Sequence, residues 1–157
     1  MKKNVLIFHS AKHPVVEKNI EYVLSKYTDC TVWLCLQQEC IERYQNVKNL
    51  KILEFPNGMF NYENTLADKE MCKRLTEVVF DEIYIPYSTR EPNCDEIKKI
   101  VIKILNKRKV FFYDISGNVI SDSISLITID KLKEEFIDRA EYVVAKIIGS
   151  LYYCIRS

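Results

Sequence analysis

Glycine is scarce in this sequence, and its scarcity excludes several ligand-binding motifs. The chain contains only three glycines, Gly58, Gly117 and Gly149, and none of them follows the first predicted strand. The dinucleotide fingerprint G-x-G-x-x-G is therefore absent from that loop, and no P-loop G-x-x-x-x-G-K-[ST] occurs. The elbow G-x-S-x-G is also missing, which excludes the usual nucleophile of α/β hydrolases.

The sequence also lacks an excess of charge of either sign. Lysine and arginine total 23 against 22 aspartate and glutamate residues, a formal net charge of +1. Nucleic-acid-binding proteins usually carry a basic excess or a basic face, so we expect no nucleic-acid partner. A chain of 157 residues with 48% hydrophobic residues is expected to form a single domain over residues 1–157.

No secretory signal is visible at the start of the sequence. The apolar run between Lys3 and His9 extends only from Val5 to Phe8, which is too short for the core of a signal peptide. We therefore expect a cytoplasmic protein whose six cysteines are reduced and mostly buried. Because no C-x-x-C occurs, we predict no zinc ribbon and no metal.

Short apolar runs alternate with helical patterns along the chain. Strands are predicted at residues 4–9, 31–36, 50–55, 82–87 and 109–114, with short ones at 119–120 and 126–129. Helices are predicted over 14–27, 38–44, 63–75, 93–105 and from about residue 131 to near the C-terminus. This order predicts a single three-layer α/β domain, Rossmann-like or flavodoxin-like, with a mostly parallel sheet and a long C-terminal helix.

The helix predicted after residue 92 has the clearest pattern. Asn93 is a suitable N-cap, and Glu96 follows three residues later, close to a capping box. Apolar residues then recur at helical spacing, which places Lys98, Lys99 and Lys103 on the outward face.

Polar side chains follow three of the predicted strands. In an open α/β sheet, ligands bind outside the carboxyl ends of the strands, so these loops hold the candidate ligand-binding residues. The candidates are His9, Ser10, Lys12, His13, Ser88, Thr89, Arg90, Asp114, Ser116 and Asn118. Together they offer hydroxyl, amide and cationic groups suited to a phosphate, a sugar or a carboxylate, and no cofactor is predicted.

Several of these candidates have a simpler interpretation. His9 and His13 lie on different predicted elements and share no helical face, so surface histidines are favoured over a ligand-contacting loop or a metal pair. Arg90 can bind an anion through two nitrogens, but a solvated loop arginine beside Glu91 is the favoured interpretation. Asp114 is favoured as the turn residue that the following Ser-Gly requires. No nucleophile–base pair is recognisable, so no catalytic residue is predicted.

The C-terminal segment is apolar over its last turns. From Tyr142 to Ile155 the only charged residue is Lys146, and the run is too short and interrupted to span a bilayer. Packing of this predicted helix on the sheet is favoured. A partner surface, above all for a homodimer, is the next alternative, and docking to a membrane surface is the least favoured.

Residues 80–120 contain a strand with a polar loop (DEIYIPYSTR), a helix, and a strand that ends in the D-x-x-G turn at Asp114. Together with the N-terminal KNVLIFH, they resemble the N-terminal Rossmann-like half of GT-B glycosyltransferases, over about a third of the chain. In that superfamily the nucleotide sugar is bound mainly by a second Rossmann-like half, which we expect this chain not to contain.

The resemblance therefore implies an acceptor-side or accessory glycosyltransferase-like domain for cell-surface glycan biosynthesis. It also implies a sugar or nucleotide-sugar ligand and a second Rossmann-like subunit as partner. The alternative is a non-catalytic Rossmann-like domain for interaction or small-molecule binding that self-associates through its C-terminal helix. Whether the chain is an enzyme is left open.

Overall fold

The computed structural model describes residues 2–56, 58–89 and 94–123. The chain divides into two units, Met1–Ser123 and Ile124–Ser157, so everything described belongs to the first unit. The predicted strand at residues 126–129 and the predicted C-terminal helix lie outside the described residues. The single-domain prediction for residues 1–157 therefore stays a prediction.

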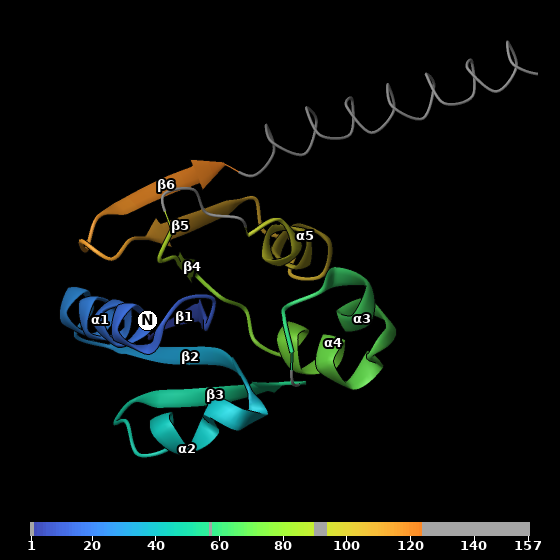
Figure 1. Cartoon of the computed structure of the whole chain (residues 1–157), viewed down its shortest axis with the longest axis horizontal. Helices are drawn as coiled ribbons and strands as arrows, with labels where there is room; N and C mark the ends of the chain where they lie inside the picture. Colours follow the sequence, from blue (N-terminus) through green and yellow to red (C-terminus); the bar gives the residue numbers. More distant parts are fainter. Residues whose placement is uncertain (1, 57, 90–93, 124–157) are drawn as a thin grey trace, which may run out of the picture. The chain divides into compact units, whose positions relative to one another are not determined.

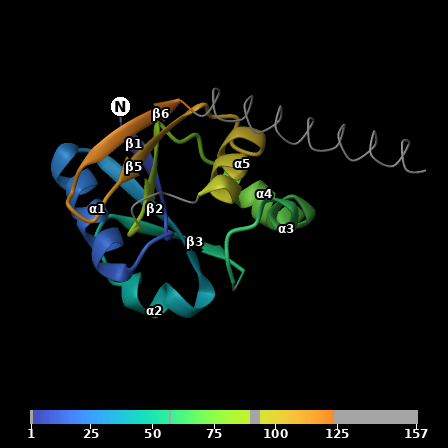
Figure 2. The same cartoon turned by 45° about the horizontal axis from the view of Figure 1, so that its top comes forward.

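The first unit is built on a six-stranded sheet with the order β3-β2-β1-β4-β5-β6, which can be followed in Figures 1 and 2. The strands are β1 (Lys3–Phe8), β2 (Cys30–Gln37), β3 (Leu50–Phe55), β4 (Glu82–Pro86), β5 (Lys109–Tyr113) and β6 (Val119–Ser123). Among these described strands, only the β5–β6 pair is antiparallel. The prediction of an α/β domain with a mostly parallel, Rossmann-like sheet is confirmed.

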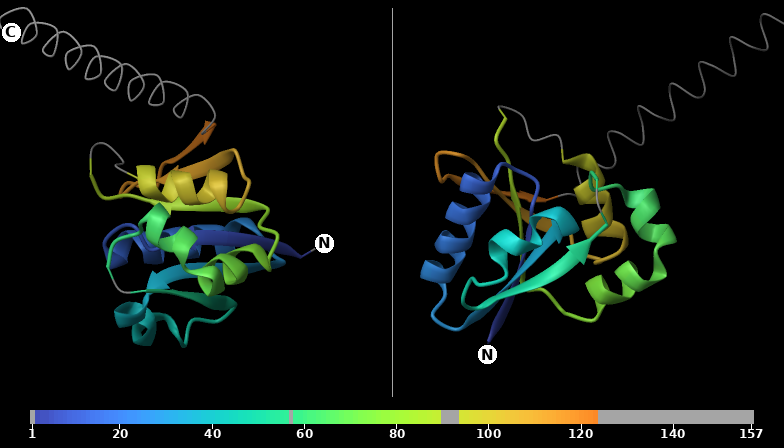
Figure 3. Two further views of the ribbon diagram at one scale, coloured as in Figure 1. Left: turned by 90° about the vertical axis from the view of Figure 1, so that its right-hand side faces the viewer. Right: turned by 60° about the horizontal axis from the view of Figure 1, so that its bottom comes forward.

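Helices cover both faces of this sheet, so the unit has three layers (Figure 3). The helices are α1 (His13–Lys26), the 3-10 turn η1 (Gln38–Cys40), α2 (Ile41–Tyr44), α3 (Tyr62–Ala67), α4 (Lys69–Thr76) and α5 (Asp95–Lys103). Helices α1 and α2 lie on one face, and α3, α4 and α5 lie on the other (Figure 1). The short helix predicted at residues 38–44 is confirmed as η1 and α2.

The central strand β1 shows why the sheet forms. Its neighbours β2 and β4 and the two helical layers leave Val5, Leu6, Ile7 and Phe8 with no exposed surface. Because successive side chains point to opposite faces, Val5 and Ile7 enter the core beneath α1, whereas the Phe8 ring meets Phe60 on the other face. Full burial of each such side chain contributes about 1.5–3 kcal/mol.

Helix α1 is amphipathic, with one polar exception on its buried face. Val15, Val16, Ile20 and Val23 fill the core beneath it. Asn19 is fully buried beside them, and its side-chain amide has no hydrogen-bond partner among the described residues. A buried amide left in this state costs about 1–3 kcal/mol.

The single helix predicted over residues 63–75 is wrong, because the chain forms two helices there. Asp68 has an extended backbone (φ −86°, ψ 93°) that ends α3, and its carboxylate then accepts a hydrogen bond of 3.0 Å from the backbone N–H of Met71. Asn61 caps α3 in the same way through the N–H of Asn64. Each cap satisfies a backbone donor that a helix start leaves free.

Two predictions for the next helix need correction. Lys98 does not face outward: it is 9% exposed, with its ammonium 5.0 Å from the centre of the Phe112 ring and 3.9 Å from the Asp122 carboxylate. Strands β5 and β6 thus place an aromatic ring and a carboxylate where the periodicity predicts solvent. The N-cap position of α5 is Cys94 and not the predicted Asn93, and Glu96 accepts a hydrogen bond of 2.8 Å from the backbone N–H of Tyr62.

Candidate functional site

The strand order defines a topological switch point at one edge of the sheet, the place where open α/β sheets form a ligand crevice. From β1 the chain crosses through α1 to β2 on one side of β1, whereas from β4 it continues through α5 to β5 on the other side. The loops after β1 and β4 therefore leave the sheet in different directions, at its C-terminal edge. Ligands of open α/β sheets bind at such a switch point, so residues 9–12 and 87–89 frame the candidate site.

Two hydrogen bonds tie these loops together. The Ser10 hydroxyl donates to the carbonyl oxygen of Pro86 at 2.6 Å, and the Lys12 backbone N–H donates to the Ser88 hydroxyl at 3.2 Å. The loop after β1 is thus held against the loop after β4. The Ser10 oxygen can still accept a hydrogen bond and the Ser88 hydroxyl can still donate one, so both remain able to contact a ligand.

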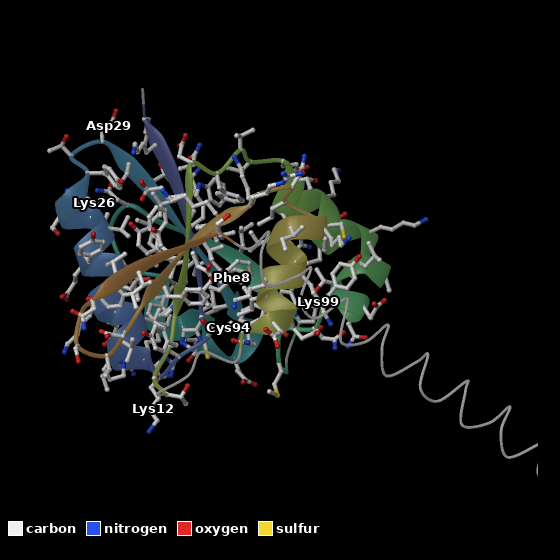
Figure 4. All side chains as sticks on the ribbon, turned by 90° about the horizontal axis from the view of Figure 1, so that it is seen from above. Phe8, Lys12, Lys26, Asp29, Cys94 and Lys99 are labelled. Atoms are coloured by element: carbon white, nitrogen blue, oxygen red, sulfur yellow. The ribbon has the colours of Figure 1, made fainter. Side chains whose placement is uncertain are left out.

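Lys12 is an exposed cation beside this switch point. It stands at the start of α1, where its backbone precedes the first helical turn, and Pro14 occupies the beginning of the helix. Figure 4 shows its side chain at the opposite end of the sheet from Lys26 and Asp29. The positive end of a helix and an ammonium group both favour an anionic or oxygen-rich ligand here.

His9 and His13 meet beside this crevice, although they lie on different elements. The Nε2 atom of His9 is 3.0 Å from Nδ1 of His13, and the same Nδ1 is 3.0 Å from the Tyr44 hydroxyl of α2. The Cys40 thiol of η1 completes the group, since one ligand atom from each of His9, His13 and Cys40 lies within 4.8 Å of the others. Both histidines and Cys40 are half-buried.

Burial changes the acid–base behaviour of this group. It lowers the pKa of His9, and the neighbouring His13 lowers it further. Burial, with the nearby carboxylate of Glu17, raises the pKa of Tyr44 to about 12. At neutral pH the His9 ring is therefore uncharged and the Tyr44 phenol keeps its proton.

Asp114 belongs to a turn that uses its own polar groups. One carboxylate oxygen accepts from the Asn118 backbone N–H and the other from the Asn118 side-chain amide, both at 2.8 Å. The Gly117 N–H donates to the Asp114 carbonyl at 3.1 Å, and the positive φ of Gly117 (+87°) favours glycine there. The interpretation of Asp114 as a turn residue is confirmed. Ligand contacts by Asp114, Ser116 or Asn118 stay predictions.

Arg90, the proposed anion contact, lies outside the described residues. Thr89 precedes it and is exposed in the loop after β4. Five of the ten candidate residues therefore gather on the first strand loop and its neighbour: His9, Ser10, Lys12, His13 and Ser88.

Sequence reasoning missed Cys40 and Tyr44 as members of this group. Both were treated as part of a short helix, about thirty residues from the histidines. The signal that could have found them is their position just after β2. Because β2 is parallel to β1, the residues that follow both strands lie at the same edge of the sheet.

The sequence matches no known protein-family model and no curated protein. Among the helices of the described unit, none combines the length and apolar character that a bilayer-spanning helix requires. The five cysteines within the described ranges, Cys30, Cys35, Cys40, Cys72 and Cys94, are all free.

Proposed function

We propose that this chain is a glycosyltransferase-like domain of the acceptor-side or accessory kind. It acts in the cytoplasm, in cell-surface glycan biosynthesis, and binds a sugar or nucleotide sugar in the crevice between β1 and β4. The observation that carries this proposal is the pair of polar loops tied across the switch point by Ser10 and Ser88. The GT-B-like pattern of residues 80–120 supports the sugar class.

The groups in the crevice suit such a ligand. Sugar hydroxyls both donate and accept hydrogen bonds, and the hydroxyls of Ser10 and Ser88 each keep one such capacity. The exposed ammonium of Lys12 adds a charge for a phosphate or an acidic sugar. Neither feature requires a reaction, so binding without catalysis is the simpler proposal. Transfer would then need a second Rossmann-like subunit to hold the nucleotide sugar.

A binding screen with matched variants tests the proposal. The purified chain is heated with nucleotides, nucleotide sugars and sugar phosphates, and we expect one class to raise its melting temperature. Lys12→Ala should weaken that ligand about tenfold, about 1.4 kcal/mol, because it removes the charge at the crevice. Lys18→Ala, which changes an exposed lysine on the same helix, should leave the affinity unchanged. A panel without any shift, or equal losses in both variants, would contradict the proposal.

A second candidate function rests on the C-terminal segment of the sequence. A single charged residue, Lys146, between Tyr142 and Ile155 leaves a segment suited to burial against a homodimer partner or a second Rossmann-like subunit. In this case the chain is an interaction domain without catalysis. Light scattering of the full chain tests it: a monomer whose mass does not change with concentration argues against self-association.

A further inference from the structure

The two histidines of the whole chain lie in contact with each other, beside a cysteine from a third element. His9 follows β1, His13 begins α1, and Cys40 ends η1 after β2. We propose that His9, His13 and Cys40 bind a zinc ion. This site does not depend on the proposed sugar ligand, although it lies beside the same crevice.

The spacing of the three ligand atoms fits one tetrahedral ion. Zinc binds imidazole nitrogen at about 2.0–2.1 Å and thiolate sulfur at about 2.3 Å, so two bound nitrogens lie roughly 3.3 Å apart and a nitrogen and a sulfur roughly 3.6 Å apart. The two ring nitrogens are 3.0 Å apart, and all three ligand atoms lie within 4.8 Å of one another. Small side-chain rotations therefore bring all three to one centre.

The chemistry of the donors selects the ion. Two imidazoles and a thiolate suit zinc, whereas magnesium and calcium prefer oxygen ligands. The half-buried positions of all three side chains leave a path for an ion to enter. Three protein ligands fill three tetrahedral positions, and the fourth is left for water or a ligand oxygen, as in zinc sites that stay open.

The neighbouring Tyr44 hydroxyl fits the same arrangement. It lies 3.0 Å from the His13 Nδ1 atom, which is the atom that would bind zinc. When zinc takes this nitrogen, the nearly buried phenol can donate instead to a water on the open fourth position. Without metal, the two histidines and Tyr44 form only a hydrogen-bonded group, and this is the competing explanation for their contact.

Zinc would also join separate parts of the chain. It would link the loop after β1 and the start of α1 to the turn after β2. Because zinc would bind the folded chain, one equivalent should raise the melting temperature.

The test uses the full, untagged chain after removal of metal with a chelator. Zinc titration should show one equivalent bound, with a higher melting temperature. Cobalt, which substitutes for zinc and absorbs light, should give a thiolate-to-cobalt charge-transfer band. Cys40→Ser should abolish this band and weaken zinc binding at least tenfold, and His9→Gln should weaken zinc binding by a similar factor. Cys72→Ser, at a half-buried cysteine on α4, should keep both properties.

The wild-type protein decides the matter even if a variant fails to fold. Absence of stoichiometric zinc binding to the folded wild type would overturn the proposal and leave the hydrogen-bonded group as the explanation. Zinc binding that survives both Cys40→Ser and His9→Gln would also overturn it. Loss of the cobalt band in Cys72→Ser, with the band kept in Cys40→Ser, would place the metal elsewhere.

Discussion

Glu82 shows how one carboxylate can fasten a helix to the sheet. It begins β4 at the edge opposite the candidate site, and its side chain accepts hydrogen bonds from Tyr27, from Tyr84 at 3.0 Å and from the Lys26 ammonium at 3.3 Å. Burial alone would raise the pKa of Glu82, but these hydrogen bonds and the charge of Lys26 outweigh it and lower the pKa. The last turn of α1 is thereby tied to the first residue of β4.

Replacing this carboxylate should destabilise the protein in a pH-dependent way. Since the pKa of Glu82 is lower in the folded chain than its ordinary value of 4.5, the ionised group stabilises the fold above that pH, and this contribution is lost as the pH falls through the folded pKa. Glu82→Gln should lower the free energy of unfolding by about 2 kcal/mol at neutral pH. Urea unfolding of both proteins at neutral and at strongly acidic pH measures the difference.

An exposed ion pair serves as the control for Glu82. Glu77 pairs with Lys73 one helical turn away, and both side chains are more than half exposed. Glu77→Gln should therefore change the free energy of unfolding by less than about 0.5 kcal/mol. Equal effects of the two substitutions, or a Glu82→Gln effect that is unchanged in acid, would contradict the role given to Glu82.

Single residues were predictable from the sequence only where their neighbours along the chain decide their environment. Asp114 was assigned to a turn because Ser116 and Gly117 follow it two and three residues later. The contact between His9 and Cys40 was not predicted, because it depends on β1 and β2 being adjacent and in a particular register. The prediction that Lys98 faces outward was wrong for the same reason. Its surroundings come from β5 and β6, which the periodicity of the helix cannot show.

At the scale of elements, the strands were the most predictable part. Their continuous apolar runs reflect burial on both faces, which the alternation of strands and helices already implies. The break between α3 and α4 was missed, because helix-forming residues continue on both sides of Asp68. What ends α3 there is a local capping bond that competes with helix continuation.

The bond from Glu96 to the start of α3 predicts a coupling between two helices. Glu96→Ala should lower the free energy of unfolding by about 1 kcal/mol, because the N–H of Tyr62 loses its carboxylate acceptor. Glu96→Ala also removes the 2.8 Å ion pair of Glu96 with Lys99 inside α5, so the free energy of unfolding alone does not separate the two contacts and the Tyr62 amide reports the bond between the helices. Hydrogen exchange of the Tyr62 amide should become faster in the variant.

Glu63 offers the matched comparison. It lies in the first turn of α3 and is exposed, so Glu63→Ala removes a carboxylate from the same helix start without removing an acceptor of the Tyr62 N–H. We expect this substitution to leave the exchange rate of the Tyr62 amide nearly unchanged. If Glu63→Ala accelerates that amide as much as Glu96→Ala, general charge at the helix start explains the effect and the specific bond does not.

At the scale of the whole molecule, the sequence predicted the class of fold but not the order of its strands. Alternating strands and helices require a largely parallel sheet, yet they do not say that β4 lies beside β1. That adjacency sets the switch point and brings Ser10 to Pro86, more than seventy residues away along the chain. The candidate loops were therefore predictable, whereas the bonds between them were not.

The sheet order also predicts where the protein opens first. Strands β1, β2 and β4 are central, and nearly all of their apolar side chains are buried, whereas β6 pairs with β5 alone among the described strands and exposes most of its residues. Amides of the central strands should exchange with solvent only through global unfolding, while amides of β6 should exchange through local opening at much lower free energy. Native-state hydrogen exchange at increasing denaturant separates the two, because only global opening responds steeply to denaturant. Amides of β6 as slow as those of β1 would show that this edge opens only with the whole fold, and that something beyond the described residues covers it.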